Sequence, residues 1–319
     1  MKLKDLAEII LSYEKIIIAG HVNPDGDAVG SCLALGLFLK SKGKDVFVLL
    51  EEYNERYNIL NGAELVYKGE LKDLKPQIFI ALDSGDKKRL GAFAKVFDNA
   101  EKTVVIDHHI SNDNYGDYNY VDCTASATCE IIYKIISEMG GLDKAMAENL
   151  YAGLITDTGG LRHKNTTADT FEIASSLIKK DINFTEIYSE VFFAKSLTEH
   201  LIFTKVISDI EFLKDYPIAY AFASREMLLE TGSTQKDLDG IVEYINNIRG
   251  VCVAVFAYEL EDGIKLSMRS KSLDVSRVAK KIGGGGHVNA AGASVKATLE
   301  CALDKVINII KSEMDENGY

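Results

Sequence analysis

Short apolar runs alternate with segments of helical spacing early in the chain, and this alternation limits the fold more than any other feature. Runs rich in Ile, Val and Leu indicate buried strands at residues 15–20, 45–50, 78–83 and 103–109. Residues 28–42, between the first two runs, have helical spacing, and Gly43 follows as a C-cap. Such a series predicts an α/β fold, a parallel sheet with helices on both faces.

Acidic and histidine side chains stand at the ends of four apolar runs. KIIIAG leads into HVNPDGDAVGS, IFIAL into Asp83, TVVI into Asp107-His108-His109, and LYAGLIT into Asp157. One such residue alone is usually a turn former or a helix N-cap. Four together favour a single site, because ligands bind beyond the carboxyl ends of the strands in open parallel sheets. We therefore expect these side chains, all placed at strand ends, to converge in one crevice.

The acidic residues of this set indicate divalent cations. His21, Asp25 and Asp27 share one loop, on which the two carboxylates can face two neighbouring ions. Without cations, carboxylates brought together would repel one another and resist burial. Mixed carboxylate and imidazole ligands suit Mn²⁺, Fe²⁺ or Zn²⁺ better than Mg²⁺. The carboxylates that would balance two divalent ions are Asp25, Asp27, Asp83 and Asp157.

The second half of the chain predicts a helical connection and a smaller α/β domain. Residues 169–209 have a helical pattern without Gly or Pro, and we interpret them as one long link between domains. A strand (216–224) and a helix (234–249) open the second domain. Two strands, a helix, a glycine run, a short strand and a final helix from about residue 298 complete it.

A glycine run and a basic strand form a second candidate site. Gly283 to Gly286 precede His287, and a flexible linker is the alternative interpretation of this run. We favour a cradle for a phosphate or a terminal nucleotide, because successive glycines let backbone N–H groups approach an anion. The strand GIKLSMRSK supports this by placing one set of polar side chains on one face, namely Lys265, Ser267, Arg269 and Lys271.

The composition of the chain restricts the kinds of molecule that we expect it to bind. The formal net charge of -12 argues against a general nucleic-acid-binding surface, and no aromatic stripe alternates with Lys and Arg. We therefore expect short substrates.

The N-terminus lacks the pattern of a signal peptide, and no apolar run is long enough to span a bilayer. The five cysteines form no CxxC pair, so we expect a cytoplasmic protein without a membrane partner; a homodimer stays open.

Several motifs resemble one known family. HVNPDGDAVGS, ALDSGD, IDHH and LITDTGG, in this order, resemble the four motifs of the DHH phosphoesterases, and SMRSK and GGGGHVNAAGAS resemble their DHH-associated C-terminal domain. The likeness extends over nearly the whole chain and suggests the NrnA-like branch of oligoribonucleases and adenosine 3′,5′-bisphosphate (PAP) phosphatases. It implies a catalytic domain at residues 1–190, a helical linker at 191–212 and a substrate-binding domain at 213–319, with an active-site cleft between the domains.

The resemblance also implies roles for the residues of the first domain. His21 and Asp25 would bind one metal ion, and Asp83 would bridge it to a second. His109 would contact the phosphate, and Asp107 would orient a ligand. The ligands of the second ion would be Asp27, His108 and Asp157.

Substrate contacts follow from the resemblance in the same way. Residues of the basic strand and the glycine run would hold the substrate: Ser267, Arg269, Gly285, Gly286 and His287. Many relatives carry Arg directly after the TDTG motif, where this chain has Gly160. Arg162 is our candidate for that missing contact, whereas a plain loop role suits His163 equally well.

The expected activity is hydrolysis of phosphate esters. Two divalent ions, Mn²⁺ first among them, would activate a hydroxide that cleaves short oligonucleotides (nanoRNA, linear dinucleotides) to mononucleotides, or adenosine 3′,5′-bisphosphate to AMP. One alternative is a pApA or pGpG phosphodiesterase of cyclic-dinucleotide turnover. Another is a manganese inorganic pyrophosphatase, against which the glycine run with His287 argues. A non-catalytic nucleotide sensor would have lost metal ligands, and all six are present.

Overall fold

The structure of the protein is a computed structural model, and it describes residues 2–318. Contacts divide the chain between Ala194 and Lys195 into two compact units, each with hydrophobic cores of its own. This point falls inside the linker predicted at 191–212.

The first unit contains a parallel sheet, as predicted. Within the described residues it has five strands in the order β2-β1-β3-β4-β5. All neighbouring pairs are parallel, which confirms the α/β fold class. The last strand was not predicted, because YNYV is short and its side chains are only half buried. The strands are β1 (Lys15–Ala19), β2 (Asp45–Leu49), β3 (Ile78–Leu82), β4 (Lys102–Asp107) and β5 (Tyr118–Val121).

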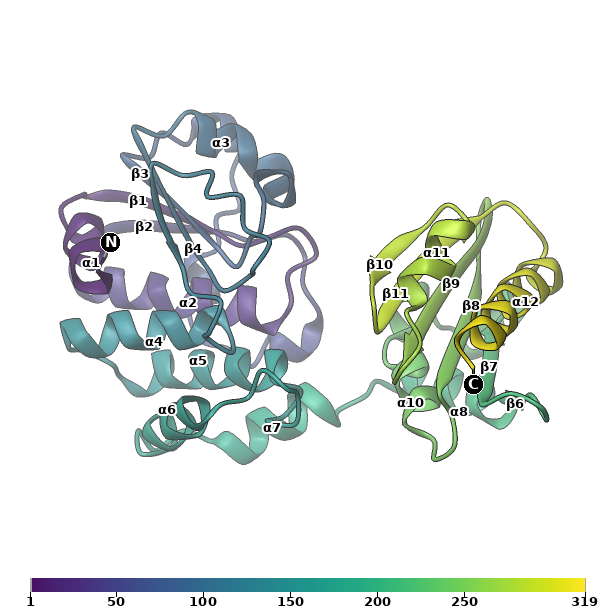
Figure 1. Ribbon diagram of the computed structural model, residues 1–319. Helices are drawn as coiled ribbons and strands as arrows, with labels where there is room; N and C mark the ends of the chain where they lie inside the picture. The colour runs from purple at the N-terminus through teal and green to yellow at the C-terminus, as the bar shows by residue number, and fades with distance from the viewer. Residues whose placement is uncertain (1, 319) are drawn as a thin grey trace. The chain divides into compact units, whose positions relative to one another are not determined.

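Helices cover both faces of this sheet (Figure 1). Ile16 and Ile80 face a layer that is built mainly from α2 (Gly26–Ser41), α4 (Thr128–Met139) and α5 (Lys144–Asp157). α1 (Leu3–Leu11) adds to that core. Ile17 and Phe79 point to the opposite face, where η4 (Lys87–Phe93) and α3 (Ala94–Asp98) pack. Because both faces are buried, β3 is apolar throughout, and β1 and β4 are apolar along their buried middle residues.

Glycines let α2 and α5 approach each other closely. A Cβ on Gly30 would lie 2.5 Å from the carbonyl oxygen of Asn149. A Cβ on Gly153 would lie 3.1 Å from the Cα of Asp27 on α2, and 2.3 Å from the Cys129 sulfur on α4. Only hydrogen fits at these positions, so the two helix backbones almost touch. Their contact brings Asp27, in the first turn of α2, toward Asp157 at the end of α5.

The predicted single helical connection is wrong in one respect, because it is three helices. They are α6 (Ala168–Ile178), α7 (Phe184–Phe192) and α8 (Leu197–Ser208). Asp181 has a left-handed backbone (φ 60°) and separates the first two. A capping box at Ser196 starts the third. α8 packs against the second unit, so the greater part of the predicted linker belongs there.

The second unit has a mixed sheet. Its six strands, counted over the described residues, have the order β10-β11-β9-β8-β7-β6. β7 and β8 pair in parallel, and the other pairs are antiparallel. The strands are β6 (Glu211–Phe212), β7 (Ile218–Ala223), β8 (Val253–Leu260), β9 (Gly263–Ser270), β10 (Gly285–His287) and β11 (Ala290–Val295).

Helices cover the two faces of the second sheet unequally. α11 (Val275–Lys281) and α12 (Leu299–Asn317) pack on one face. On the other face, α8, α9 (Arg225–Thr231) and α10 (Ile241–Asn247) pack over β7 and β8. The outward side chains of β9 and β11 lie beyond that core and stay partly exposed.

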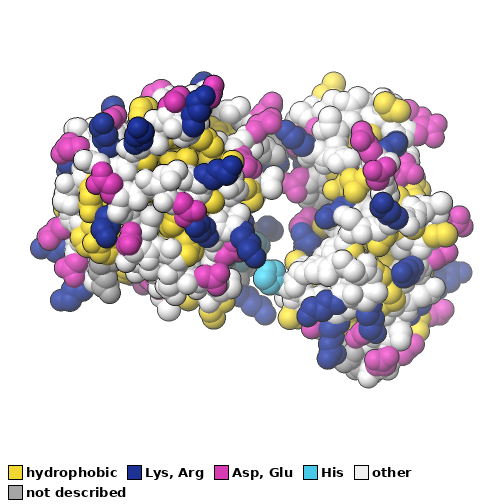
Figure 2. Space-filling view, turned by 90° about the horizontal axis from the view of Figure 1, so that it is seen from above, with side chains coloured by type: hydrophobic (Ala, Val, Ile, Leu, Met, Phe, Trp, Pro, Cys, Tyr) yellow, Lys and Arg dark blue, Asp and Glu magenta, His cyan; other side chains and the backbone are white. Residues whose placement is uncertain are grey.

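The remaining elements are short 3-10 helices: η1 (Glu55–Tyr57), η2 (Ala63–Leu65), η3 (Leu71–Asp73) and η5 (Gln235–Leu238). No helix among the described residues combines the length and the apolar character needed to cross a membrane. On the face of the first unit that Figure 2 shows, acidic and basic side chains are interspersed.

Candidate metal centre

The loop after β1 and the start of α2 supply the first three candidate ligands. The buried His21 follows β1, and its Nδ1 lies 2.8 Å from the carbonyl oxygen of Val22. Asp25 is the N-cap of α2, where Oδ1 accepts hydrogen bonds from the backbone N–H groups of Asp27 and Ala28, both 3.1 Å. Asp25 therefore caps α2 in addition to offering a carboxylate to a metal ion, and the capping bonds fix the orientation of that carboxylate.

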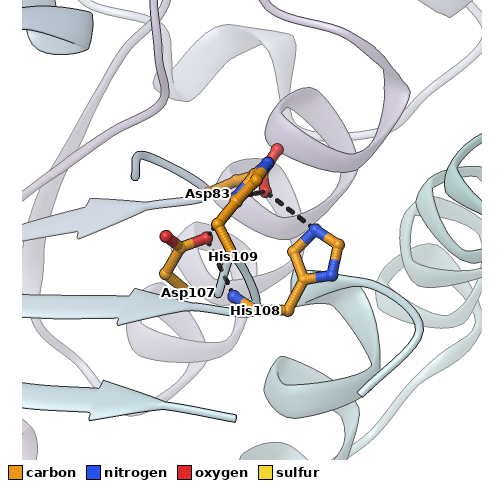
Figure 3. Close-up of side chains that lie close together, drawn as sticks. All are labelled: Asp83, Asp107, His108 and His109. Atoms are coloured by element: carbon orange, nitrogen blue, oxygen red, sulfur yellow. Dashed lines mark hydrogen bonds and ion pairs between the residues drawn. The ribbon is translucent and has the colours of Figure 1, made fainter. Parts of the chain in front are cut away.

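Asp83 lies at the centre of the cluster. It follows β3, is only 1% exposed, and has a left-handed backbone (φ 53°) that is costly for a residue other than glycine. Its Oδ2 lies 3.5 Å from His21 Nε2. Its Oδ1 lies 3.6 Å from both His108 Nε2 and His109 Nδ1 (Figure 3). The strained backbone thus points one buried carboxylate at three imidazoles.

The Asp107-His108-His109 segment leaves the end of β4. Asp107 Oδ1 accepts the backbone N–H of His108 (2.8 Å) and lies 2.7 Å from His109 Nδ1. Its Oδ2 accepts the side-chain amide of Asn112 (2.6 Å). Burial alone would raise the pKa of Asp107, but the hydrogen bonds with His109 and Asn112 lower it. The bond to Asp107 raises the pKa of His109, so this dyad favours the charged pair.

Asp157 reaches the cluster from a helix, which corrects the expectation that every ligand follows a strand. It is the last residue of α5, a helix that Asp143 caps at its start. Its Oδ2 lies 3.2 Å from His108 Nε2. The stretch AENLYAGLI has helical spacing, so treating LYAGLIT as the end of a strand conflicted with the sequence pattern itself. Helices on several sides bury α5, which explains why it is so rich in apolar residues.

The N-terminus of α4 holds Asp27, and sequence reasoning missed this contact. The fully buried carboxylate accepts the backbone N–H groups of Thr128 (2.6 Å) and Cys129 (2.8 Å). Thr128 Oγ1 also donates to Asp83 Oδ1 (3.1 Å). The first turn of a helix attracts anions through its free N–H groups and its dipole. The only sequence signal was the hydroxyl residue Thr128 at the start of TCEIIYKIISEM, a stretch with helical spacing.

Among the residues that the structure describes, three groups of side chains have ligand atoms that lie within 4.8 Å of one another. The six predicted metal ligands all belong to them, and Asp83 belongs to two. The groups are His21, Asp25 and Asp83; Asp27, His108 and Asp157; and Asp83, Asp107, His108 and His109.

The electrostatics of this cluster fit divalent cations. Burial, followed by the charges of Asp83 and Asp157, raises the pKa of Asp27 well above its usual range. Burial and the charge of Asp83 raise the pKa of Asp157 to about 8. Burial alone would lower the pKa of His21, but Asp25 and Asp83 raise it to about 10. The metal-free cluster therefore takes up protons in place of cations, and its oxygen and imidazole donors suit a transition metal ion.

The predicted substrate residues of the second unit share one face of its sheet. Side chains of β9 alternate between buried and partly exposed, which leaves Lys265, Ser267 and Arg269 on the open side. Arg269 pairs with Ala290, and Ala290 pairs with His287. Three neighbouring strands thus present one row of side chains.

The glycine run is ordered structure instead of a flexible linker. Gly285 and Gly286 belong to β10 and pair with β11. Gly286 has a φ of 142°, and a Cβ there would lie 2.5 Å from the carbonyl oxygen of Ala290. Lys271 does not join the open face. It donates to the carbonyl oxygens of Ile248 (3.2 Å) and Val251 (2.8 Å) and so closes the end of α10.

Arg162 and His163 lie on the exposed loop after α5. Arg162 Nε donates to the carbonyl oxygen of Gly159 (2.8 Å), and His163 Nδ1 lies 3.3 Å from that of Asp157. Gly160 has a φ of 72°, and a Cβ there would lie 2.4 Å from the Tyr188 hydroxyl. An arginine at position 160 would therefore need Tyr188 to move and would be strained by the positive φ.

The chain is similar to known proteins over nearly all of its length. Residues 15–154 match the DHH family, N-terminal domain, and residues 215–316 match the DHHA1 domain. A bifunctional oligoribonuclease and PAP phosphatase NrnA from Thermus thermophilus is 31% identical, over 100% of this chain and 96% of its own length.

Solved structures show the same architecture. An exopolyphosphatase-related protein from Bacteroides fragilis has a TM-score of 0.89 and 27% identity, and the match covers 98% of this chain and 96% of that one. The exonuclease RecJ, solved with bound manganese, has a TM-score of 0.52 and 12% identity, with 96% and 93% coverage. At this identity the second likeness supports the fold alone.

Proposed function

The chain belongs to the DHH family of phosphoesterases, hydrolases of phosphate esters, and carries a DHHA1 domain in its second half. From this premise we propose that it cleaves short oligonucleotides to mononucleotides and adenosine 3′,5′-bisphosphate to AMP, in the cytoplasm. A relative 31% identical over the whole chain carries both activities in its name. The observation that carries the proposal is the convergence of His21, Asp27, Asp83, His108 and Asp157 around one point.

We assign two divalent ions to the cluster, with Mn²⁺ as the preferred metal. One ion would be held by His21 and Asp25, the other by Asp27, His108 and Asp157, with Asp83 between them. Such a pair lowers the pKa of a bound water and offsets negative charge at phosphorus. The groupings of ligand atoms support this division, because Asp83 contacts His21 through one oxygen and His108 through the other.

The chain's own residues would orient the ester and handle protons. Asp107 is fully buried and holds Nδ1 of His109, which leaves Nε2 of that imidazole free to point at a substrate. A positively charged His109 would bind a phosphate oxygen. The raised pKa of His109 favours that charged form near neutral pH.

The second unit would recognise the nucleotide. Arg269 offers a guanidinium for phosphate, and the backbone of Gly285 and Gly286 lies open because no side chain covers it. His287 and Ser267 add donors on the same face of the sheet. This small set suits one terminal nucleotide, which is why we expect short substrates.

Hydrolysis with Mn²⁺ tests the proposal. The full chain should cleave short oligoribonucleotides and adenosine 3′,5′-bisphosphate, with pApA and pyrophosphate assayed beside them. Asp83→Asn should reduce bound metal and lower turnover by at least about 100-fold, because its neutral amide is a poor bridge between cations. The matched control, Asp262→Asn in the exposed turn between β8 and β9, should behave as wild type. Absence of hydrolysis of every nucleotide with Mn²⁺ would contradict the proposed function.

A further inference from the structure

Arg269 is held in one orientation by contacts at all three nitrogens of its guanidinium. Nε donates to Glu243 Oε1 (2.8 Å), and Nη2 lies 2.7 Å from the same oxygen. Nη1 donates to the carbonyl oxygen of Met268 (3.0 Å). These contacts use three of the guanidinium's five N–H groups. One N–H group on each Nη is left over by the described contacts. When the Met268 carbonyl accepts the Nη1 hydrogen that faces Cδ, these two form the end-on edge, which binds a phosphate with two parallel hydrogen bonds.

Residues with small side chains lie beside that edge of the guanidinium. Ala290, opposite Arg269 on β11, and Gly292, opposite Ser267, have little or no side chain. His287 continues the row on β10 and is exposed. An anion can therefore reach the guanidinium edge and the backbone of the outer strands together.

Glu243 reaches this surface from the neighbouring helix. It lies on α10, which packs over β7 and β8 through Ile241 and Ile245 and so leaves Glu243 on its flank. Its side chain is 45% exposed and that of Arg269 is 32% exposed. A carboxylate near an anion site repels the anion, but water weakens that repulsion at this exposure. Fixing a long side chain in advance, by contrast, saves ordering that binding would otherwise require.

We propose that Glu243 is a positioning residue, which turns the end-on edge of Arg269 toward the phosphate of the substrate. This inference rests on the proposed function and adds a residue that the family motifs do not include. A different role, in which Glu243 occupies Arg269 and must be displaced by substrate, predicts the opposite sign. In that case neutralising Glu243 would tighten substrate binding.

Kinetics of Glu243→Gln and Glu243→Ala with Mn²⁺ and adenosine 3′,5′-bisphosphate separate these roles. We expect KM to rise by about 10-fold for the alanine variant and less for the glutamine variant, because binding is lost without change to the bond-breaking step. Turnover and bound metal should stay near wild type. Glu226→Gln on α9, an exposed glutamate in the same unit, is the matched control. A fall in KM, or an unchanged KM in both variants, would overturn the proposal.

A double-mutant cycle excludes a purely structural role. In an Arg269→Ala background, Glu243→Ala should raise KM no further, because the group that Glu243 positions is gone. An equal rise in that background would mean that the substitution disturbs α10 itself and would refute the assignment. If the alanine variant fails to fold, the glutamine variant carries the same comparison.

Binding separates this inference from the proposed function. Calorimetry of the full chain with adenosine 3′,5′-bisphosphate gives Kd whether or not the nucleotide is cleaved. A wild-type protein that binds without turnover would contradict the proposed function. The Glu243 variants would then be compared by Kd, which should rise as KM is expected to rise. A wild-type protein that neither binds nor cleaves this nucleotide would overturn both.

Discussion

Thr128 contacts two of the proposed metal ligands from the first turn of α4. Its backbone N–H holds Asp27, and its hydroxyl donates to Asp83. Loss of the hydroxyl would free Asp83 to rotate while the helix N–H groups still hold Asp27. The residue is therefore a test of how strongly orientation of the central carboxylate affects the reaction.

Thr128→Val should lower kcat/KM by roughly 10-fold, since it removes a bond that orients a ligand and keeps the side chain's shape. The free energy of unfolding should fall by only about 1 kcal/mol, as for one lost hydrogen bond. Steady-state kinetics and denaturant unfolding measure the two effects. Thr204→Val on α8, whose hydroxyl donates to a backbone carbonyl, is the control and should leave kcat/KM unchanged. Equal activity of the two variants would show that Asp83 needs no such support.

Protons and metal ions compete for the cluster, which gives metal-free protein a distinctive pH dependence. The pKa of Asp157 rises from 3.8 to about 8 on folding, and that of His21 rises from 6.5 to about 10. A raised pKa stabilises the fold below the unfolded pKa and loses that contribution as pH rises through the folded pKa. Metal-free protein should therefore lose stability between about pH 5 and about pH 8. The lowered pKa values of Asp25 and Asp107 act only in more acid solution.

Thermal unfolding with EDTA and with Mn²⁺ checks this dependence. The increase in Tm on adding Mn²⁺ should be larger at about pH 8 than at about pH 5, because the ions displace fewer protons at the higher pH. A rise in Tm that is the same at both pH values would contradict the predicted protonation of the cluster.

Some residues of the candidate site could be predicted from the sequence, and others could not. The six ligand candidates could be named because their side chains carry the chemistry that metal binding needs. Thr128 and Glu243 could not, since each acts through a partner far along the chain, at Asp83 and Arg269, and only the fold brings the partners together.

At the scale of elements, the contact between α2 and α5 sets the distance between ligands on the two helices. Gly30 and Gly153 occupy it, and the atoms that a Cβ on Gly30 would meet include backbone of α5. Backbone cannot turn away as a side chain can, so added volume must separate the helices.

Gly30→Ala should therefore reduce the free energy of unfolding by about 1–3 kcal/mol, the usual cost of overpacking. It should also weaken metal binding, because Asp27 and Asp157 move apart. Gly36→Ala on the same helix is the control. A Cβ there would lie 3.0 Å from Val48 Cγ2 and 3.1 Å from Leu65 Cδ1, which are side-chain atoms that can shift. Its effect should stay within about 1 kcal/mol, partly offset by the better helix propensity of alanine. Metal titration of both variants measures the change in metal affinity, and denaturant unfolding measures the change in the free energy of unfolding.

Elements with strong periodic patterns were predicted well, and short ones were not. The four central strands differ from prediction by one or two residues at their ends, because continuous apolar runs mark them clearly. β5 and β10 escaped prediction, since a tyrosine-rich tetrapeptide and a glycine run lack that mark. The helical connection was split by the left-handed backbone at Asp181 and by the cap at Ser196, which the pattern of apolar residues does not reveal.

At the scale of the whole molecule, the two units have separate hydrophobic cores, and the metal candidates belong to one of them. A ligand that binds one folded unit stabilises that unit alone unless the units unfold together. Mn²⁺ at about 100 times its Kd should add about 2.7 kcal/mol to the first unit. Differential scanning calorimetry should show one transition that shifts with Mn²⁺ and one that does not. A single transition that shifts as a whole would show that the units unfold cooperatively.

The burial of two neighbouring carboxylates has a consequence for how such a chain changes over generations. Asp27 and Asp83 are almost fully buried, and without cations their charges oppose folding. Neutral replacements would make the metal-free protein more stable, so drift without selection for catalysis would remove these residues early. Asp27 and Asp83 together therefore cost the metal-free protein stability, which bound cations would restore.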